Sequence, residues 1–370
     1  MNTMISAMHI SGYKSILNAQ ISLKSLNILS GINSSGKSSF IQCIKMIEGL
    51  LHGKTGPLEH LGSLDELLFK KSRPNEDLHA PDHISISAKF DRGEITWFTE
   101  NDDQSEDKKK KSNYKITGAI PTEPQYIYNF LSAARFGPQP FLPSKAETRG
   151  FSLGENGEYV CDCLDVYKDI PLPPTLQHPD SVGVTLSYNT AAWLSDIVAN
   201  AQFAVKREQL FDLANMTYNG HRASNVGFGL SYTLPVIAGL LGMPVIAKQQ
   251  NMSALLIVEN PEAHLHPKGQ TRLGQLMALS AISGVQIIVE THSDYIIDGV
   301  RLAIKKGVDL ANGNNQKVPP EEVNFLFFKL NEDNYSNIDV ISSNTSGLLD
   351  KWPQGFFDQS RKNKSLLAGL

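Results

Sequence analysis

The stretch of sequence that decides the fold runs from residue 26 to residue 51 and reads LNILSGINSSGKSSFIQCIKMIEGLL. Its first five residues form an apolar run typical of a buried strand, and the apolar residues of its last part recur at helical spacing. Between them, GINSSGKS (31–38) matches the pattern G-x-x-x-x-G-K-[ST], whose glycines let backbone N–H groups turn inward around phosphates. A strand, a Gly-rich loop and a helix in this order predict a phosphate-binding loop.

A loop of this kind assigns a role to each polar residue. Lys37 is expected to reach the β- and γ-phosphates of a nucleotide, and the Ser38 hydroxyl is expected to ligate Mg²⁺. The sequence therefore predicts ATP and Mg²⁺ as cofactors. The candidate nucleotide-binding residues of the loop are Gly31, Asn33, Ser34, Ser35, Gly36, Lys37, Ser38 and Ser39.

A second motif, LLIVENPEAHLHP, spans residues 255–267. Its apolar run predicts a buried strand that delivers Glu259 to the carboxyl edge of a sheet, where doubly wound sheets bind their ligands. We expect Glu259 to hold the metal ion through water, so that Ser38 and Glu259 are the candidate metal residues. His264-Leu265-His266 beside Glu262 could be mistaken for a metal cluster, but the following Pro267 favours a turn.

Two further motifs complete the candidate site. VETHSDYII (289–297) predicts a second buried strand, which ends close to His292, and a histidine there can contact the γ-phosphate or the attacking water. SNVGFGLS (224–231) places two glycines and a serine at the start of a predicted helix, a combination that can bind an anion but is a weak signal alone. The candidate catalytic residues are Lys37, Glu259, Asn260, Glu262 and His292.

Composition narrows the class of protein. The 370 residues contain 34 basic and 38 acidic side chains, a net charge of −4, so no overall basic field indicates nucleic acid. Three cysteines do not make a disulfide framework, and Cys161 and Cys163 lack the second cysteine pair of a zinc site. We found no N-terminal signal peptide and no apolar run near 18 residues, and therefore expect a cytoplasmic chain without contact to a membrane.

The order of predicted elements indicates an α/β fold. Strands are expected near the N-terminus and again between 84 and 118, where the lysine-rich run at Lys108–Lys111 reads as a solvated hairpin tip. A helix-like start is expected at 126, an exposed proline-rich linker around 171–179, and helix over 187–219. Strands and helices alternate from 254 to 330, which favours a parallel sheet.

Taken together, GYKSILNAQISLKSLNILSGINSSGKSSFIQ, ENPEAHLHP and VETHSD resemble the ABC-type ATPase heads of the SMC, Rad50 and RecF group. They are most similar to ATPases of the OLD (overcoming lysogenization defect) kind. LGSLDELLFK, LSAARFGPQP and KWPQGFFDQS further resemble a bacterial AAA-family branch found beside nuclease genes in phage-defence loci.

This resemblance implies a phosphate-loop ABC-ATPase head: a mixed, largely parallel sheet core, an antiparallel β subdomain and a helical lobe. The first ATPase lobe would cover 1–145, the helical lobe 146–245, and the remainder of the ATPase core with a C-terminal tail 246–370.

It also implies a homodimer with ATP sandwiched between two heads, or a higher oligomer. Gly227, Gly229 and Ser231 of one protomer would complete the nucleotide site of the other. The glutamine that couples nucleotide state to the helical lobe has only Gln42 and Gln125 as candidates.

Asn260 departs from the family pattern, in which two acids end this strand. An amide can orient a water but cannot take its proton, and losing a general base costs roughly 10²–10⁴-fold. Three interpretations stay open: Glu262 substitutes as the base, hydrolysis is slow and the ATP-bound dimer is the working state, or the chain is an ATP-dependent clamp without turnover.

Three functions compete at this point. The first is an ATP-gated sensor or regulatory subunit of an anti-phage complex that controls a separate nuclease or toxin, with nucleic acid reached through the complex. The second is a RecF- or Rad50-like ATPase that binds DNA itself during repair. The third is an ATP-binding scaffold. The aromatic WPQGFFDQ segment (352–359) is expected either to dock on the core or to contact a partner.

Overall fold

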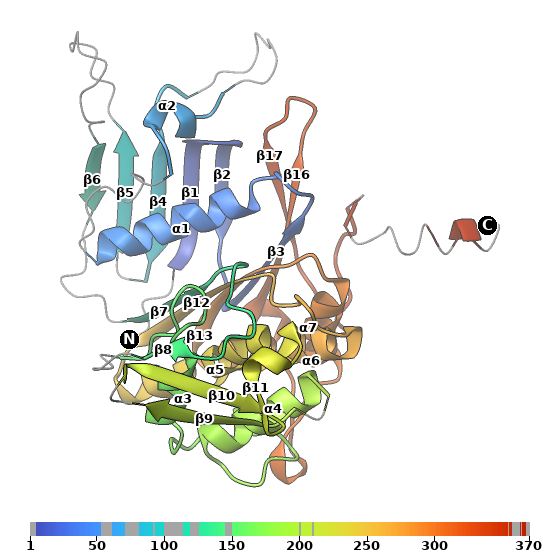
Figure 1. Ribbon diagram of the computed structural model, residues 1–370. Helices are drawn as coiled ribbons and strands as arrows, with labels where there is room; N and C mark the ends of the chain where they lie inside the picture. The colour runs from blue at the N-terminus through green and yellow to red at the C-terminus, as the bar shows by residue number, and fades with distance from the viewer. Residues whose placement is uncertain are drawn as a thin grey trace.

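The computed structural model (Figure 1) describes most of the chain around one central sheet. It describes residues 5–52, 61–70, 81–91, 93–99, 114–118, 126–144, 150–199, 201–208, 211–353, 355–356, 363 and 365–367.

The central sheet has six strands in the order β17-β16-β3-β13-β12-β7. All neighbours are parallel except β17, which runs antiparallel to β16. The strand that leads into the phosphate loop, β3, therefore lies between β13 and β16, and not beside β12. The strands are β3 (Leu26–Gly31), β7 (Tyr126–Leu131), β12 (Ser253–Glu259), β13 (Val285–Glu290), β16 (Val323–Leu330) and β17 (Ser336–Ile341).

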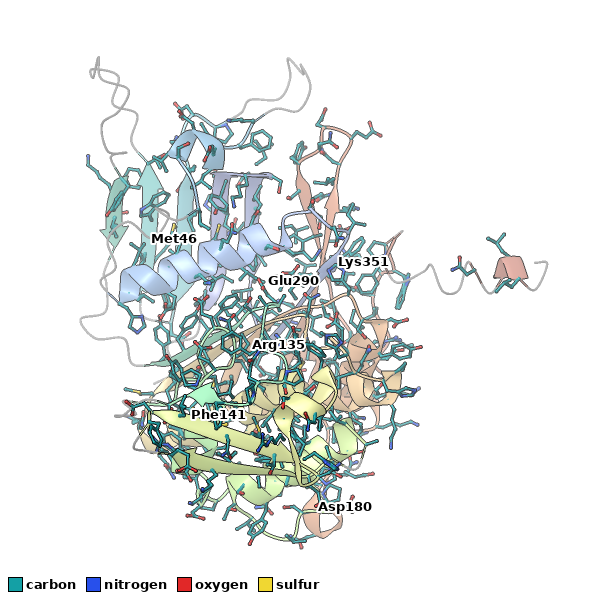
Figure 2. The ribbon with its side chains drawn as sticks, in the orientation of Figure 1. Met46, Arg135, Phe141, Asp180, Glu290 and Lys351 are labelled. Carbon is teal, nitrogen blue, oxygen red and sulfur yellow. The ribbon has the colours of Figure 1, made fainter. Side chains whose placement is uncertain are left out.

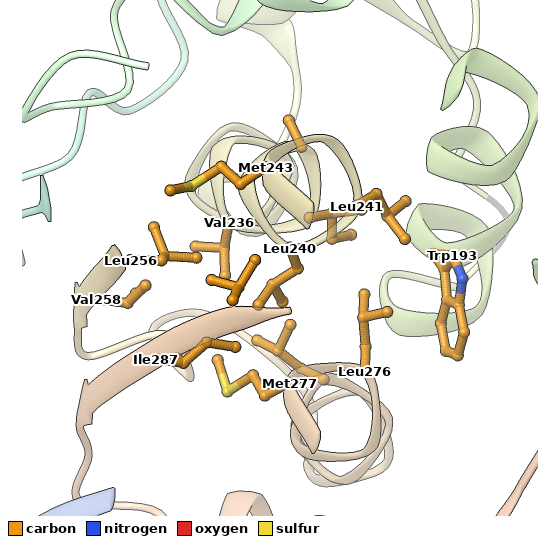
Figure 3. Close-up of a cluster of buried hydrophobic side chains, with 14 of the residues drawn as sticks. Trp193, Val236, Leu240, Leu241, Met243, Leu256, Val258, Leu276, Met277 and Ile287 are labelled. Carbon is orange, nitrogen blue, oxygen red and sulfur yellow. The ribbon is translucent and has the colours of Figure 1, made fainter. Parts of the chain in front are cut away.

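The inner strands β12 and β13 are buried on both faces, which explains why they are almost continuous apolar runs. In β12, Leu256 and Val258 face α5 (Phe228–Gln249) and α6 (Pro267–Ile282), as Figure 3 shows. Leu255 and Ile257 face the opposite core, which α1 (Lys37–Leu51) fills. The alternation follows from the two-residue period of a strand.

Beyond α1 lies a five-stranded antiparallel sheet in the order β2-β1-β4-β5-β6, at the top of Figure 1. This part confirms the predicted antiparallel β region. Its strands, with the short helix that packs on them, are β1 (Ile5–Tyr13), β2 (Ile16–Ser22), β4 (Ser85–Phe90), β5 (Gly93–Thr99), β6 (Tyr114–Gly118) and α2 (Leu64–Leu67).

The opposite end of the molecule combines helices with a second small antiparallel sheet, where β10 pairs with β8, β9 and β11. The elements of this lobe are α3 (Val160–Val166), α4 (Leu186–Ile197), β8 (Leu142–Pro143), β9 (Phe203–Glu208), β10 (Leu213–Tyr218) and β11 (His221–Arg222). The C-terminal third adds α7 (Asp294–Lys305), β14 (Val308–Asp309) and β15 (Asn315–Gln316). Short 3₁₀ turns lie at Pro174–Leu176, Ala223–Asn225, Ala311–Gly313 and Pro320–Glu322.

Two local predictions were wrong. The segment expected to begin a helix at 126 is strand β7, because six residues rich in aromatic and β-branched side chains fit the edge of a parallel sheet and are too few for helical periodicity to be read. The predicted helix over 187–219 ends at Ile197, and the residues after it form the β9–β10 hairpin. In β10 burial alternates residue by residue, as in a strand.

Two further expectations also need correction. The proline-rich segment is not an exposed linker, because Leu172, Leu176 and His178 are buried against the core. The apolar stretch in α5 has the length and hydropathy of a membrane-spanning helix, contrary to the expectation that no run came near 18 residues. In the most apolar stretch of α5, 78% of the residues are buried inside the fold, as they are in a core helix.

The described residues of the aromatic C-terminal segment, 352–353 and 355–356, include one ring that docks on the core, one of the two outcomes expected for the segment. Phe356 is fully buried, and its ring lies 5.3 Å from that of Phe327 and 5.1 Å from that of Trp352. Trp352 keeps its other face half exposed beside Arg301. Gln125 and Lys108–Lys111 lie outside the described residues.

We predict that Leu256→Ala destabilises the fold by about 2–5 kcal/mol, because it leaves a cavity between the sheet and α5. The matched control is Leu348→Ala, the same change at a side chain that is 56% exposed, where we expect a change within about 0.5 kcal/mol. Urea denaturation of the two variants measures the difference. Equal shifts in the unfolding midpoint would contradict this assignment of the core.

Candidate functional site

The phosphate loop connects β3 to α1 through backbone conformations that favour glycine. Gly31 has φ 138° and Gly36, the residue before α1, has φ 104°. A Cβ atom on Gly31 would lie 2.0 Å from the Phe328 carbonyl oxygen, and one on Gly36 would lie 2.3 Å from the Ser336 Oγ. The loop therefore runs close against the β16–β17 hairpin and directs the N-terminus of a 15-residue helix toward its own interior.

Lys37 is folded back on this loop. Its Nζ donates hydrogen bonds to the carbonyl oxygens of Gly31 (3.0 Å) and Ile32 (2.8 Å), and it lies 3.8 Å from Glu290 Oε1. Burial lowers the pKa of the Lys37 ammonium, and the nearby Glu290 carboxylate opposes that change. The ammonium is thus a buried cation held by weak acceptors, which phosphate oxygens can replace.

Glu290 is the carboxylate next to Ser38, and the sequence analysis did not select it. The Ser38 Oγ donates to Glu290 Oε2 at 3.4 Å. Burial raises the pKa of Glu290, while Lys37 lowers it. A signal was present in the sequence, because Glu290 ends the apolar run VQIIVE directly before Thr291-His292. That run was read only for its histidine.

Strand order explains why Glu290, and not Glu259, is the carboxylate next to Ser38. Glu259 and Glu290 are paired residues at the ends of β12 and β13, so both reach the carboxyl edge of the sheet. Of these two strands, β13 is the one adjacent to β3. The Glu259 carboxylate instead accepts a hydrogen bond from the Ala133 N–H at 3.0 Å. Metal ligation by Glu259 remains a prediction.

Asn260 begins a tight turn with a left-handed backbone, φ 44°. Its N–H donates to the Glu290 carbonyl oxygen at 2.8 Å, which ties the turn to the end of β13. Asparagine tolerates this conformation better than glutamate does. Among the described residues no hydrogen-bond partner engages the Asn260 side-chain amide, so it remains available to a water or a ligand.

Glu262 is held by the residues that follow β13. The Thr291 Oγ1 donates to its Oε2 at 2.8 Å, and the His292 N–H donates to its Oε1 at 2.7 Å. The pKa of the His292 imidazole is lowered, because the ring is partly withdrawn from water and stands near Lys37; Glu262 opposes this shift. The structure therefore brings Lys37, Glu262, Glu290 and His292 together around one end of the phosphate loop.

The glycine-rich segment before α5 presents a different picture. Gly227 is exposed and faces open space, and Gly229 packs so close to the turn after β12 that a Cβ would lie 2.9 Å from the His264 carbonyl oxygen. The Ser231 hydroxyl is buried inside the lobe, where it lines a small cavity with Ala214 and Met216. No hydrogen bond or ion pair among the described residues joins this segment to the phosphate loop of the same chain. Its role in a partner's site stays a prediction, and Ser231 faces away from the surface.

The two histidines of the HLH sequence serve the turn and the helix after it. The ring of His264 lies 5.2 Å from that of Phe228 and 5.0 Å from that of Tyr232, both on α5. The His266 Nδ1 accepts from the Lys268 N–H at the start of α6. Within the described ranges, no group of three His, Cys, Asp or Glu side chains is arranged to hold a metal ion.

Gln42, a candidate for the coupling glutamine, lies on α1 and accepts hydrogen bonds from Tyr13 Oη (3.0 Å) and Lys14 Nζ (2.7 Å). Arg135, like Glu290, was not among the candidate site residues of the sequence. Its side chain contacts both the end of β12 and α5. A signal was present in the sequence, because Arg135 belongs to LSAARFGPQP, a segment that carries the family resemblance.

Comparison with known families agrees with this geometry. Residues 165–298 match the family model described as "AAA domain, putative AbiEii toxin, Type IV TA system", and residues 318–367 match a model for a protein of unknown function. A search of curated proteins found no match to the chain.

Solved structures support the fold. The Smc head domain of Pyrococcus furiosus with an extended coiled coil, bound to the C-terminal domain of ScpA, is 11% identical, with 98% of this chain and 99% of that chain covered at a TM-score of 0.55. The Smc head of Pyrococcus yayanosii is 9% identical, with coverages of 97% and 99% and a TM-score of 0.53. The recombination mediator protein RecF, at 10% identity and coverages of 91% and 98%, has a TM-score of 0.42, so the fold assignment rests on the two Smc heads.

The predicted fold class is thus confirmed: the chain has the α/β fold of SMC-type ATPase heads, and its middle third is similar to AAA ATPase domains.

Proposed function

We propose that this chain binds Mg²⁺ and ATP at residues 31–38, hydrolyses ATP slowly, and uses the ATP-bound dimer as the working state of a regulatory subunit. The observation that carries the proposal is the convergence of Lys37, Ser38 and Glu290 where the loop enters α1. A cation, a hydroxyl and a carboxylate at a helix N-terminus form the set of groups that binds a metal–triphosphate.

The residues present fit both groups. Gly31 and Gly36 have positive φ, and such a backbone can turn its N–H groups inward around phosphates. Mg²⁺ prefers one or two carboxylates together with phosphate oxygens and waters, so Ser38 and Glu290, with Glu259 behind them, make a suitable site. When bound, the ion neutralises charge that develops on the transferring phosphoryl group.

The chain's own residues would then divide the work. Lys37 exchanges two carbonyl oxygens for phosphate oxygens, and His292, with its lowered pKa, is neutral at pH 7 and can hydrogen-bond the attacking water. Each oxygen of Glu262 already accepts one hydrogen bond, from Thr291 or from the His292 N–H, and these bonds make the carboxylate a weaker base. The unengaged amide of Asn260 can orient water without accepting its proton.

This division supports slow turnover over the other two interpretations. Phosphoryl transfer depends mainly on positioning and charge stabilisation, which Lys37 and the metal residues supply. The backbone of Asn260 also gives a structural reason for the amide, because a glutamate at φ 44° carries a cost of about 1–2 kcal/mol.

Two comparisons support the regulatory role. The matched AAA model is described as a putative toxin of a type IV TA system, and the Smc head domain of Pyrococcus furiosus was solved bound to a separate protein, ScpA. We propose that this chain likewise acts through a partner, a nuclease or toxin of an anti-phage complex, in the cytoplasm. Gly227 and Gly229 would contribute to the partner protomer's nucleotide site in a homodimer.

We predict that Lys37→Ala abolishes ATP binding and that Glu290→Gln raises the Mg²⁺ concentration needed for half-maximal hydrolysis by about 10- to 100-fold, because it removes the carboxylate next to Ser38. The control is Glu321→Gln, the same change at an exposed position. Hydrolysis is measured against Mg²⁺ at fixed ATP. An unchanged Mg²⁺ dependence in Glu290→Gln would remove Glu290 from the metal site.

Asn260→Asp is expected to raise kcat by about tenfold or more, since aspartate brings a base and tolerates the left-handed backbone. Asn260→Glu should give a smaller increase, and Asn260→Gly, which suits the backbone but has no side chain, should give none. Single-turnover rates with saturating ATP separate the three variants. An unchanged or lower rate in Asn260→Asp would refute the assignment of Asn260 to the water-polarising position.

Dimerisation gives a separate test. Hydrolysis per chain is expected to rise with protein concentration, and ATP is expected to shift the mass in solution to that of a dimer. A chain that stays monomeric with ATP would contradict the proposal. Salt-sensitive binding of duplex DNA by the purified chain would favour the RecF-like alternative.

A further inference from the structure

Arg135 occupies an unusual place between the candidate site and the helical lobe. It follows β7, the strand that pairs with β12, and its side chain is almost completely buried. Figure 2 places it below Glu290, at the level where the central sheet meets the lobe that contains α5. It lies in LSAARFGPQP (131–140), one of the segments that resemble the bacterial AAA-family branch, but the sequence alone assigns it no role.

The guanidinium connects three segments through backbone oxygens. Nη1 donates to the carbonyl oxygens of Ser132 (2.8 Å) and Glu259 (2.7 Å), and Nη2 donates to that of Asn260 (2.8 Å). Nε donates to the carbonyl oxygen of Tyr232, in the second turn of α5, at 3.2 Å. The guanidinium is a planar fork of N–H donors that point in fixed directions, and this fork links the end of β12 to the start of α5.

The charge of Arg135 has no direct partner. No carboxylate in the described part of the chain lies within ion-pair distance of it. Burial lowers the pKa of the guanidinium to about 10, and Tyr232, Glu262 and Glu259 oppose this shift, so the group is charged at neutral pH. A buried cation without an ion pair is a poor source of stability, since the desolvation cost is incompletely offset. The fixed geometry of its hydrogen bonds therefore explains the presence of Arg135 better than a contribution to the stability of the fold does.

The same neighbourhood couples α5 to the turn after β12 by packing. His264 stacks on Phe228 and Tyr232, and Gly229 touches the His264 carbonyl oxygen. A shift of the first turns of α5 can therefore displace Asn260 through two sets of contacts: the aromatic contacts of His264 and the hydrogen bonds of Arg135. Only the fork contacts the carbonyl oxygens of Glu259 and Asn260 themselves.

We propose that Arg135 is a positioning residue that keeps the first turns of α5 and the end of β12 in one register, so that a displacement of α5 is transmitted to Glu259 and Asn260. The inference rests on the proposed ATP hydrolysis. Arg135 touches no reacting atom. It makes the arrangement of the acids depend on the position of the helix that a second protomer would contact.

The experiment compares Arg135→Lys with Arg272→Lys in the full-length chain. Arg272 is a matched control, a part-buried arginine that donates to Asp196 at 2.6 Å and stacks over Trp193, apart from the site residues. Lysine keeps the charge but cannot supply the fork. We expect Arg135→Lys to lower kcat by about 10- to 100-fold with KM for ATP within about threefold, and Arg272→Lys to change neither.

Three outcomes are distinguishable. A normal kcat in Arg135→Lys overturns the inference while leaving ATP hydrolysis intact. A parallel loss of ATP binding and kcat indicates a purely structural residue and also overturns it. Wild-type protein that binds no ATP refutes the proposed function, and the inference with it.

A second measurement covers the case in which Arg135→Lys does not fold. Amide hydrogen exchange of the wild-type chain, with and without ATP and Mg²⁺, reports on residues 228–236 and 259–264 separately. We expect the two segments to change protection together when ATP binds. A change in one segment without the other would overturn the inference.

Discussion

The site depends on one constraint: the five parallel strands of the central sheet, which are buried on both faces, all end at the same edge. Such a sheet can offer polar groups to a ligand only where its strands stop, because every side chain before that point is committed to one of two cores. β3, β12 and β13 each end there in a loop or an acid. The packing of α5 and α6 on one face and of α1 on the other sets the positions of these ends, and so determines which polar groups can meet.

At this edge of the sheet, the position of β13 determines which charged side chains lie next to each other. Because it lies between β3 and β12, its terminal Glu290 is the acid that meets Lys37 and Ser38, and Glu259 is one strand further away. The residues that follow β13 then orient Glu262 from the neighbouring turn. One strand thus connects the phosphate loop with the carboxylates, and the mutual proximity of Glu259, Glu262 and Glu290 contributes to the raised pKa of Glu290.

The left-handed backbone at Asn260 determines the shape of the turn that follows β12. Its left-handed φ and its N–H bond to the Glu290 carbonyl oxygen make the turn after β12 compact enough for Arg135 to reach two successive carbonyl oxygens in it. The asparagine at this position therefore satisfies a conformational requirement of the turn. In the proposed function, the same residue would also be the reason for slow hydrolysis.

Local pattern determined a large part of this protein. The loop at 31–38 follows from residue types whose backbone and side-chain chemistry acts within eight positions, and the apolar runs of β12 and β13 follow from burial on both faces of a sheet. What depends on neighbours distant in sequence was not available: β7 has too few residues to distinguish strand from helix, and the β9–β10 hairpin needed its partner strand. Glu290 and Arg135 have roles only because strand order places β13 beside β3 and β7 beside β12, and order in a sheet is set by packing between segments that the chain separates by more than a hundred residues.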